Sequence, residues 1–448
     1  MKIIIIGGGA VGTALAKKLA FEKHDLTIID KDPGVTRVVG ETLDVAVITG
    51  SGSHINVLER AGIADADMLI AASGTDEVNL VACMLANHAG VRHKIARIRD
   101  PEFYTSGSAE RTKTEFGINL FIRPESEVAD EVARLILRSF ASEVFEFENG
   151  SLLIACLKVD ESFQQAGVPI RQIGNEDFRR KLRLLAIRRP DKTIIPGGDD
   201  SIRHKDLIFL ATESRHLSKI LSFFGKTDTK LRRIMILGAN IIGMEIAERL
   251  CAVGLKVKLI DRNRPACLEA AARLPDVDVL HSEKSEIDTM ALAGVLETDA
   301  FIAVSDDEEN NILLNLIARH LGVNRTIALV SRSSYQPFMG SIGIDTSINL
   351  QQATANAIVR FVRKGEIVSV ASFHGIEAEA IEMALPTGSA LVGTMLKDAG
   401  IPQGAVLAAI VRDGKARIPV GETVFAEGDK AIVFALPKAI PEIERLFS

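Results

Sequence analysis

Three glycines near the start of the chain have the spacing of a phosphate-binding turn. Gly7, Gly9 and Gly12 form the pattern G-x-G-x-x-G directly after the apolar run Ile3 to Ile6. In such a turn the first glycine permits a tight bend, the second lets the backbone approach a pyrophosphate, and the third lets helix and strand pack closely. The N–H groups and partial positive charge at the start of the following helix favour an anion. The pattern therefore predicts a bound nucleotide.

An acidic residue follows eighteen positions after the third glycine. Asp30 ends a predicted strand, Leu26 to Ile29, and its carboxylate can accept hydrogen bonds from a ribose diol. The same carboxylate would repel a 2′-phosphate, which favours NAD over NADP. A glycine turn that serves only packing is the alternative, and the combination of strand, helix and acid makes it the weaker interpretation.

The elements that must position these residues follow from hydrophobic periodicity. Val11, Leu15 and Leu19 recur at helical spacing after the glycines. Further strands are predicted at Val45–Ile48, Asp67–Ala72, His93–Ile98 and Asn119–Ile122, with helices between them. Strands that alternate with helices in this way predict an α/β fold with a doubly wound parallel sheet, as in Rossmann-like domains.

Other candidate site residues lie where these strands end. The small residues Gly50 and Ser51 follow the third strand and leave room for an adenine ring or a ribose. Arg97 and Arg99 alternate across Ile98, so they share one face at a carboxyl strand end, where such sheets bind ligands. Pairing of these arginines with surface acids is the alternative that remains open.

The first stretch recurs later in the chain. Adding 231 to the numbers of the first copy brings Ile234 to Leu237, Gly238, Gly243 and Asp261 into matching places. Asn240 stands where the first copy has Gly9, which puts a side chain where backbone should meet phosphate. Leu329 and Ser331 replace the two arginines. We expect the second pocket to bind nucleotide weakly, differently or not at all.

Two small modules of different character also repeat each other, at an offset of 223. Short strands and turns dominate them, which predicts small α+β domains. Each module follows an amphipathic helix, which we interpret as a crossover or a subunit-interface helix. Arg188, Arg189, His204 and Arg412 in these modules are expected to be solvated surface charge. The predicted boundaries are 1–124 for the first Rossmann-like domain, 125–142 for a crossover helix, 143–225 for the first small domain, 231–350 for the second Rossmann-like domain, 351–366 for a second crossover helix, and 367–448 for the second small domain.

Composition excludes several other classes of protein. The net charge of −6 and an aromatic content of 5% give neither the basic patch nor the stacking rings of a nucleic-acid-binding protein. The four cysteines are scattered without a C-x-x-C pattern, so we expect small core residues and no metal. No apolar run of about 18 residues is present, so any membrane association must go through a partner.

Taken in order, these motifs resemble a known family along nearly the whole chain. Duplicated nucleotide folds, each with a small C-terminal module, are similar to the RCK (or KTN) regulators of potassium transport. The segments that carry the resemblance are Gly7–Gly12 with Asp30, Gly50–His54, Val57–Gly62, Asp65–Met68, Ala96–Glu102, Asp299–Val304, Asp307–Glu308 and Glu444–Phe447.

The resemblance implies a role for each candidate residue. The turn Gly7, Gly8, Gly9, Ala10, Val11 and Gly12 would hold phosphates and Asp30 the ribose. Ser73 and Gly74 would line the pocket beyond the pyrophosphate, and Arg97 or Arg99 would supply positive charge. The corresponding residues of the second copy are Gly238, Ala239, Asn240, Ile241, Ile242, Gly243 and Asp261.

The resemblance also implies a function without catalysis. Such subunits bind NAD(H), or ATP and ADP, and assemble into a ring, expected to be tetrameric. The ring lies in the cytoplasm on the inner face of the membrane and gates a potassium-translocating partner of the TrkH or TrkG type. Two alternatives stay open: a ligand-sensing subunit of another cation channel or antiporter, and an NAD-dependent dehydrogenase. The dehydrogenase is disfavoured because neither tyrosine has the Y-x-x-x-K spacing of one large class of these enzymes.

Overall fold

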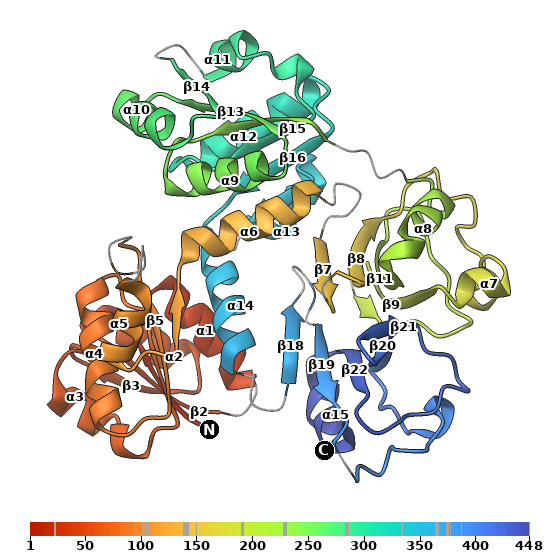
Figure 1. The fold of residues 1–448 in the computed structure, drawn as a ribbon, viewed down its shortest axis with the longest axis horizontal. Helices are drawn as coiled ribbons and strands as arrows, with labels where there is room; N and C mark the ends of the chain where they lie inside the picture. Colours follow the sequence, from red (N-terminus) through yellow and green to blue (C-terminus); the bar gives the residue numbers. More distant parts are fainter. Residues whose placement is uncertain are drawn as a thin grey trace.

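The computed structural model describes residues 1–448 apart from 22–23, 101–102, 104–107, 138–142, 149, 190–191, 227–230, 283–285, 333–334, 363–366, 373–375, 377, 387 and 448. In the described residues the chain forms a large sheet and a small sheet, and then repeats both (Figure 1). The two Rossmann-like domains lie apart from each other, whereas the two small domains lie together.

The first large sheet is parallel, and its described strands have the order β3-β2-β1-β4-β5-β6. The strands are β1 (Lys2–Ile6), β2 (Asp25–Asp30), β3 (Ala46–Thr49), β4 (Met68–Ala71), β5 (His93–Arg97) and β6 (Leu120–Ile122). The helices are α1 (Ala10–Phe21), α2 (Pro33–Thr42), α3 (Ile55–Arg60), η1 (Ile63–Asp65), α4 (Asp76–His88) and α5 (Ser108–Phe116). The doubly wound fold predicted from the sequence is confirmed.

Both faces of this sheet are covered, as the isoleucine run of β1 predicts. Ile3 and Ile5 lie in one apolar core, and Ile4 and Ile6 lie in another on the opposite face, because successive side chains of a strand alternate. The strand order reverses between β1 and β4, and in open α/β sheets ligands bind in the crevice at such a switch point. The glycine turn between β1 and α1 lies at this point.

The second large sheet repeats the first. Among the described residues its parallel strands have the matching order β14-β13-β12-β15-β16-β17. The strands are β12 (Arg233–Leu237), β13 (Lys256–Asp261), β14 (Asp278–His281), β15 (Ala300–Ala303), β16 (Arg325–Leu329) and β17 (Thr346–Ile348). The helices are α9 (Ile241–Ala252), α10 (Arg264–Arg273), α11 (Glu286–Leu292), η5 (Val295–Glu297), α12 (Glu308–His320) and α13 (Gln336–Ile342).

The small domains are antiparallel sheets with short helices. The strands of the first are β7 (Glu143–Phe147), β8 (Leu152–Lys158), β9 (Leu182–Arg188), β10 (Thr193–Ile194) and β11 (Leu207–Glu213). Its helices are η3 (Ile170–Gln172), α7 (Glu176–Arg179), η4 (Ser214–His216) and α8 (Leu217–Phe223). The second contains β18 (Ile367–Ser372), β19 (Glu379–Ala384), β20 (Ala405–Arg412), β21 (Lys415–Arg417), β22 (Lys430–Ala435), η6 (Leu396–Asp398), η7 (Pro437–Ala439) and α15 (Ile440–Phe447). Residues of both sheets form one apolar core, in which the rings of Phe209 and Phe434 lie 6.2 Å apart.

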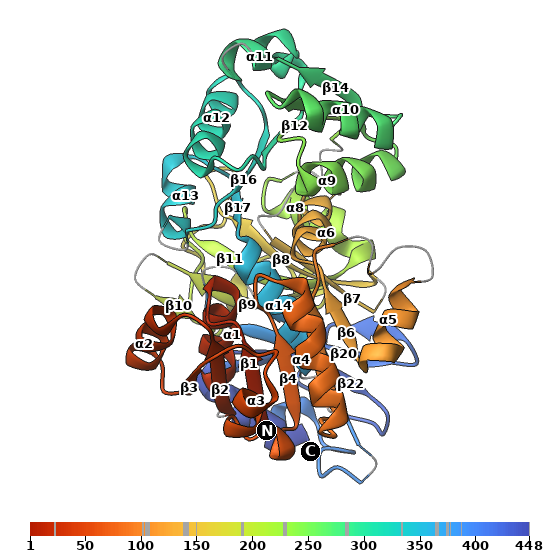
Figure 2. The same ribbon diagram turned by 90° about the vertical axis from the view of Figure 1, so that its left-hand side faces the viewer.

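Two helices connect the halves by packing across them. Helix α6 (Pro124–Leu137) follows the first large sheet, yet Val128, Val132 and Leu135 lie in the core of the second Rossmann-like domain. Helix α14 (Leu350–Val362) follows the second sheet, and Ile358 and Val359 lie in the core of the first. Figure 1 shows α6 along α9 and α14 beside α1, and Figure 2 shows the same neighbours after a turn of 90°. Each Rossmann-like domain is therefore completed by a helix from the other half.

Candidate functional site

The first glycine turn is held in shape by contacts that only glycine allows. Gly7 has a φ of +98°, and a Cβ atom there would lie 2.9 Å from the backbone of Ser73. A Cβ atom on Gly12 would lie 1.8 Å from the carbonyl oxygen of Gly7. By contrast, a Cβ atom on Gly9 would have no neighbour within 4 Å, so open space lies where a pyrophosphate would approach. Ala10 and Val11 begin α1 directly after this space.

Asp30 lies beside the turn, as its spacing predicts. Its Oδ2 accepts a hydrogen bond of 2.7 Å from the backbone N–H of Gly8, and its Oδ1 accepts one of 2.9 Å from that of Asp32. A carboxylate has about four lone-pair sites, so both oxygens retain capacity for ribose hydroxyls. The backbone N–H of Gly50 donates to the carbonyl oxygen of Asp30 at 2.8 Å, which brings Gly50 and Ser51 to the same sheet edge.

A buried asparagine that lies outside the predicted site residues supports the far side of the site. Asn79 of α4 is fully buried. Its Oδ1 accepts from the backbone N–H of Ser73 at 2.9 Å, and its Nδ2 donates to the carbonyl oxygens of Ser73 and Arg97 at 3.2 and 2.8 Å. It thereby joins the ends of β4 and β5, and Gly74 follows with open space around its Cα. Asn311 makes the same hydrogen bonds in the second copy. The recurrence of asparagine at this position of both copies is therefore the sequence signal for this supporting residue.

The two arginines at the end of β5 differ in their surroundings. Arg97 is 7% exposed, and its Nε is buried without a hydrogen bond. Burial, followed by the nearby charge of Arg99, lowers the pKa of Arg97. Arg99 is half exposed, and its Nε lies 3.8 Å from Oε1 of Glu125. The carboxylates of Glu125 and Asp76 act on the charge of Arg97 as well and offset the lowering of its pKa in part. The two arginines therefore differ mainly in burial, and Arg97 is the buried cation at the carboxyl end of β5.

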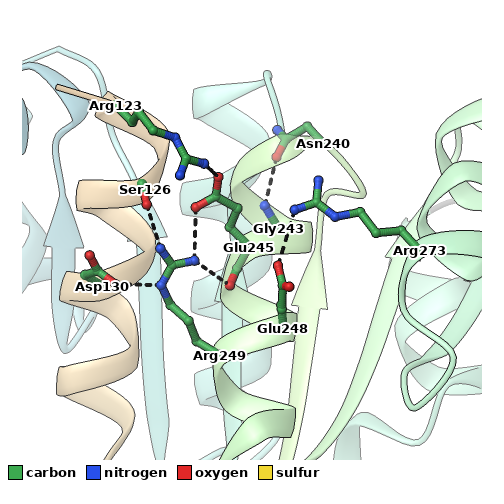
Figure 3. A network of polar contacts seen from close by, with 9 residues as sticks. All are labelled: Arg123, Ser126, Asp130, Asn240, Gly243, Glu245, Glu248, Arg249 and Arg273. Atoms are coloured by element: carbon green, nitrogen blue, oxygen red, sulfur yellow. Dashed lines mark hydrogen bonds and ion pairs between the residues drawn. The ribbon is translucent and has the colours of Figure 1, made fainter. Parts of the chain in front are cut away.

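The second glycine turn has the same backbone geometry. Gly238 has a φ of +114°, and a Cβ atom on Gly243 would lie 1.8 Å from the carbonyl oxygen of Gly238. Asp261 accepts hydrogen bonds from the backbone N–H groups of Ala239 at 2.6 Å and Asn263 at 2.7 Å. Ile241 and Ile242 begin α9. Asn240 caps α9, because its Oδ1 accepts from the N–H of Gly243 at 3.0 Å (Figure 3).

A polar network joins the second copy to helix α6 of the first half (Figure 3). Arg249 of α9 donates to Oδ1 of Asp130 at 2.6 Å, to Oγ of Ser126 at 2.6 Å, and to Oε2 of Glu245 at 3.0 Å. The other carboxylate oxygen of Glu245 accepts from Arg123, which precedes α6. The Glu245 side chain is 4% exposed, so this charge is paired from two sides inside the contact between the halves.

Arg189 and Arg412 depart from the expectation of solvated surface charge, because each forms an ion pair with a buried aspartate. The Nε atoms of Arg189 and Arg412 lie 3.1 Å from Asp206 and 2.7 Å from Asp429, whose side chains are almost fully buried. Both pairs occupy equivalent positions of the repeat. They anchor the chain turn before β11 and β22 and are part of the fold of each small domain.

The described residues give no support for a metal site or for a reactive thiol at Cys83. No group of three or more His, Cys, Asp and Glu side chains there could hold a metal ion. The cysteines are free thiols, and burial raises the pKa of Cys83 to about 12, so this thiol stays protonated. Of the described helices, none has the length and the apolar character needed to cross a membrane.

This arrangement defines a class: a protein with two nucleotide-binding-type folds, each followed by a small antiparallel domain. The TrkA-N domain model matches residues 3–124 and 234–350, and the TrkA-C domain model matches residues 166–225 and 380–448. The chain is 33% identical over 455 aligned positions to the Trk system potassium uptake protein TrkA of Azorhizobium caulinodans, with all of this chain and 98% of the relative covered.

Solved structures agree in fold. The GsuK channel bound to NAD superposes with a TM-score of 0.60 at 20% identity, over 100% of this chain and 78% of that one. The GsuK bound to ADP gives a TM-score of 0.51 at 17% identity, over 82% and 70% of the two chains. The chain belongs to the TrkA family of potassium uptake proteins. Its members are regulatory proteins of potassium transport and not enzymes.

Proposed function

We propose that this chain is the nucleotide-sensing regulatory subunit of a Trk-type potassium uptake system. NAD, as NADH or NAD⁺, or the related ligands ATP and ADP, would bind at the first glycine turn. Binding would change the state of a potassium-translocating membrane subunit of the TrkH or TrkG type. The chain would act in the cytoplasm, on the inner face of the membrane, as a ring of four copies held there by its transporter partner.

One observation carries this proposal: the first turn combines free space for phosphate with the groups that recognise the rest of a nucleotide. Gly9 leaves the space open, Asp30 fixes the turn from the ribose side, and Arg97 is a buried cation whose Nε makes no hydrogen bond. Three such features at the switch point of a doubly wound sheet match the requirements of a dinucleotide site. Two of the comparison structures, the GsuK channel with NAD and with ADP, hold ligands of this type.

The crossed helices offer a path by which ligand binding would reach the transporter. The end of β5 that carries Arg97 and Arg99 is linked to α6 through Glu125, and α6 packs on the second Rossmann-like domain. A ligand that prefers one arrangement of the halves shifts the population toward it. A tenfold preference at each site contributes about 1.4 kcal/mol, and several sites in a ring add up to a useful bias.

Binding of NADH to the purified chain tests this proposal. Asp30→Asn should weaken NADH affinity by about tenfold or more, because a charged hydrogen bond contributes roughly 1.5–3 kcal/mol. Asp25→Asn is the matched control, since Asp25 lies exposed at the other end of the same strand. Isothermal titration calorimetry measures both affinities. Equal affinity of the two variants, or steady NADH oxidation with a defined small substrate, would contradict a sensor of this kind.

A further inference from the structure

The two copies of the nucleotide fold differ at the two points where the first copy has open space. The Ser73–Asn79 and Ser305–Asn311 hydrogen bonds fix the alignment of the copies, so Gly74 corresponds to Asp306. Gly9 likewise corresponds to Asn240. A Cβ atom built on Gly9 or Gly74 would meet nothing within 4 Å, whereas the second copy has a polar side chain at each position.

The Asn240 side chain bridges the crevice of the second copy. Its Oδ1 accepts from the N–H of Gly243 at 3.0 Å, and its Nδ2 donates to the carbonyl oxygen of Val304 at 2.7 Å. The same Nδ2 lies 3.5 Å from Oδ1 of Asp306. The amide therefore spans from the start of α9 to the end of β15, across the place where backbone would meet a pyrophosphate. Its oxygen also takes one of the helix N–H groups that an anion would use.

Electrostatics at the second crevice oppose an anion as well. Asp306 is exposed and brings a carboxylate to the position that Gly74 leaves empty in the first copy. Leu329 and Ser331 stand in place of Arg97 and Arg99, so the cations at these two positions are missing. The next residue, Arg332, pairs with Glu309 and donates to Tyr335. A pyrophosphate would have to displace two hydrogen bonds of Asn240 and then lie close to a like charge.

We infer that Asn240 and Asp306 close the second fold to the pyrophosphate of a dinucleotide, so that each chain binds one dinucleotide, in its first fold. This inference rests on the proposed function, because it assigns the sensing role to one of two similar folds. The second fold then has a mechanical role. Helix α6 packs against it, and the effect of a ligand in the first fold is transmitted through this contact. Asp261 remains in its ribose-facing place and keeps a structural role, since it holds the turn through Ala239.

A reciprocal exchange of these residues tests the inference. Equilibrium dialysis of the full chain with NADH counts the bound molecules per chain. Wild type should bind one, and the double variant Asn240→Gly/Asp306→Gly should bind two. Glycine costs little at a helix N-cap, so the opened variant should fold. Adding Asp261→Asn to the opened variant should remove the second molecule and leave the first.

The opposite exchange, Gly9→Asn/Gly74→Asp, should abolish binding. Neither glycine has a positive φ, and both have open space at the Cβ position, so this variant should unfold at nearly the wild-type temperature. Two NADH molecules per wild-type chain, or a single one in the opened variant, would overturn the inference alone. A folded wild-type chain that binds no NADH would overturn the proposed function and, with it, this inference.

Discussion

The guanidinium of Arg97 is buried at the end of β5, and its Nε makes no hydrogen bond. Burial lowers the pKa of Arg97, which means that the folded chain holds the charged form at a cost. The carboxylates of Glu125 and Asp76 offset this cost in part, and an anionic ligand would add a further partner for the buried charge. The second copy has Leu329 at the equivalent position and forms the same strand, so the fold does not require this cation.

Replacement of Arg97 by the residue of the second copy should therefore separate stability from binding. Arg97→Leu should raise the free energy of unfolding by about 1 kcal/mol and weaken ADP or NADH binding by about tenfold. Urea unfolding and calorimetric titration measure the two effects. Arg92→Leu, at an exposed position just before β5, is the control and should change neither. A less stable Arg97→Leu chain with unchanged affinity would show that the cation serves the fold.

At the scale of elements, the two contacts between a crossed helix and a Rossmann-like domain are unequal. Between α6 and α9, Arg249 and Glu245 pair with each other and with residues of the first half (Figure 3). At the equivalent place between α14 and α1, Lys18 donates to Asn356. The repeat thus pairs Arg249 with two carboxylates on one side of the molecule, whereas Lys18, its counterpart on the other side, donates to a neutral amide oxygen. We expect the α6–α9 contact to be the more rigid of the two.

Glu245→Gln should weaken the α6–α9 contact. The change removes a buried negative charge that faces Arg123 and Arg249, and the expected loss in the free energy of unfolding is about 2 kcal/mol. Lys18→Met on the other side should cost less than about 0.5 kcal/mol. Guanidinium unfolding gives both values, and faster amide exchange confined to α6 and α9 would locate the effect. Equal losses for the two variants would contradict unequal contacts.

Much of this organisation could be predicted from the sequence, because strand and helix periodicity and the glycine spacing are local signals. The isoleucine run, the glycine turn and Asp30 lie where their pattern places them. The pattern of α6 revealed an apolar face but not which domain would cover it, since periodicity carries no information on the partner. The ion pairs of Arg189 and Arg412 could not be predicted, because each joins a buried acid seventeen residues away and is a tertiary contact.

At the scale of the whole molecule, the two small domains are fused through a shared apolar core, and a cluster of charged side chains also links them. The Nζ atom of Lys430, on β22, lies 2.7 Å from Oε1 of Glu148 and 3.3 Å from Oε1 of Glu382. Glu382 is almost fully buried and lies on β19, whereas Glu148 belongs to the first small domain and has a φ of +47°. Burial, together with the neighbouring Glu148, raises the pKa of Glu382 above 4.5, and the hydrogen bond from Lys430 lowers the pKa of Glu148 below 4.5.

These opposite shifts predict opposite pH dependences. Because the folded chain binds the Glu382 proton more tightly than the unfolded chain, the contribution of Glu382 is most favourable below pH 4.5 and declines as pH rises through its raised pKa. Glu382→Gln, which resembles the protonated form, should therefore gain stability over wild type as pH rises. The contribution of Glu148 is present above pH 4.5 and is lost as pH falls through its lowered pKa, so Glu148→Gln should lose stability at neutral pH.

Urea unfolding at pH 3, pH 5 and pH 8 distinguishes the two behaviours. The stability difference between Glu382→Gln and wild type should be more positive at pH 8 than at pH 5, whereas the difference for Glu148→Gln should be more negative at pH 5 than at pH 3. Differences that do not change with pH would contradict these roles for Glu382 and Glu148.

Rubidium uptake by cells shows whether nucleotide at the first turn controls potassium uptake. Cells without other potassium importers would carry the Trk membrane subunit with wild type, Asp30→Asn or Asp25→Asn chains at equal expression. We predict that wild type and Asp25→Asn support equal uptake at limiting potassium, whereas uptake with Asp30→Asn changes several-fold and no longer responds to the cellular NADH level. Equal, equally NADH-responsive uptake in all three strains would contradict control by the first site.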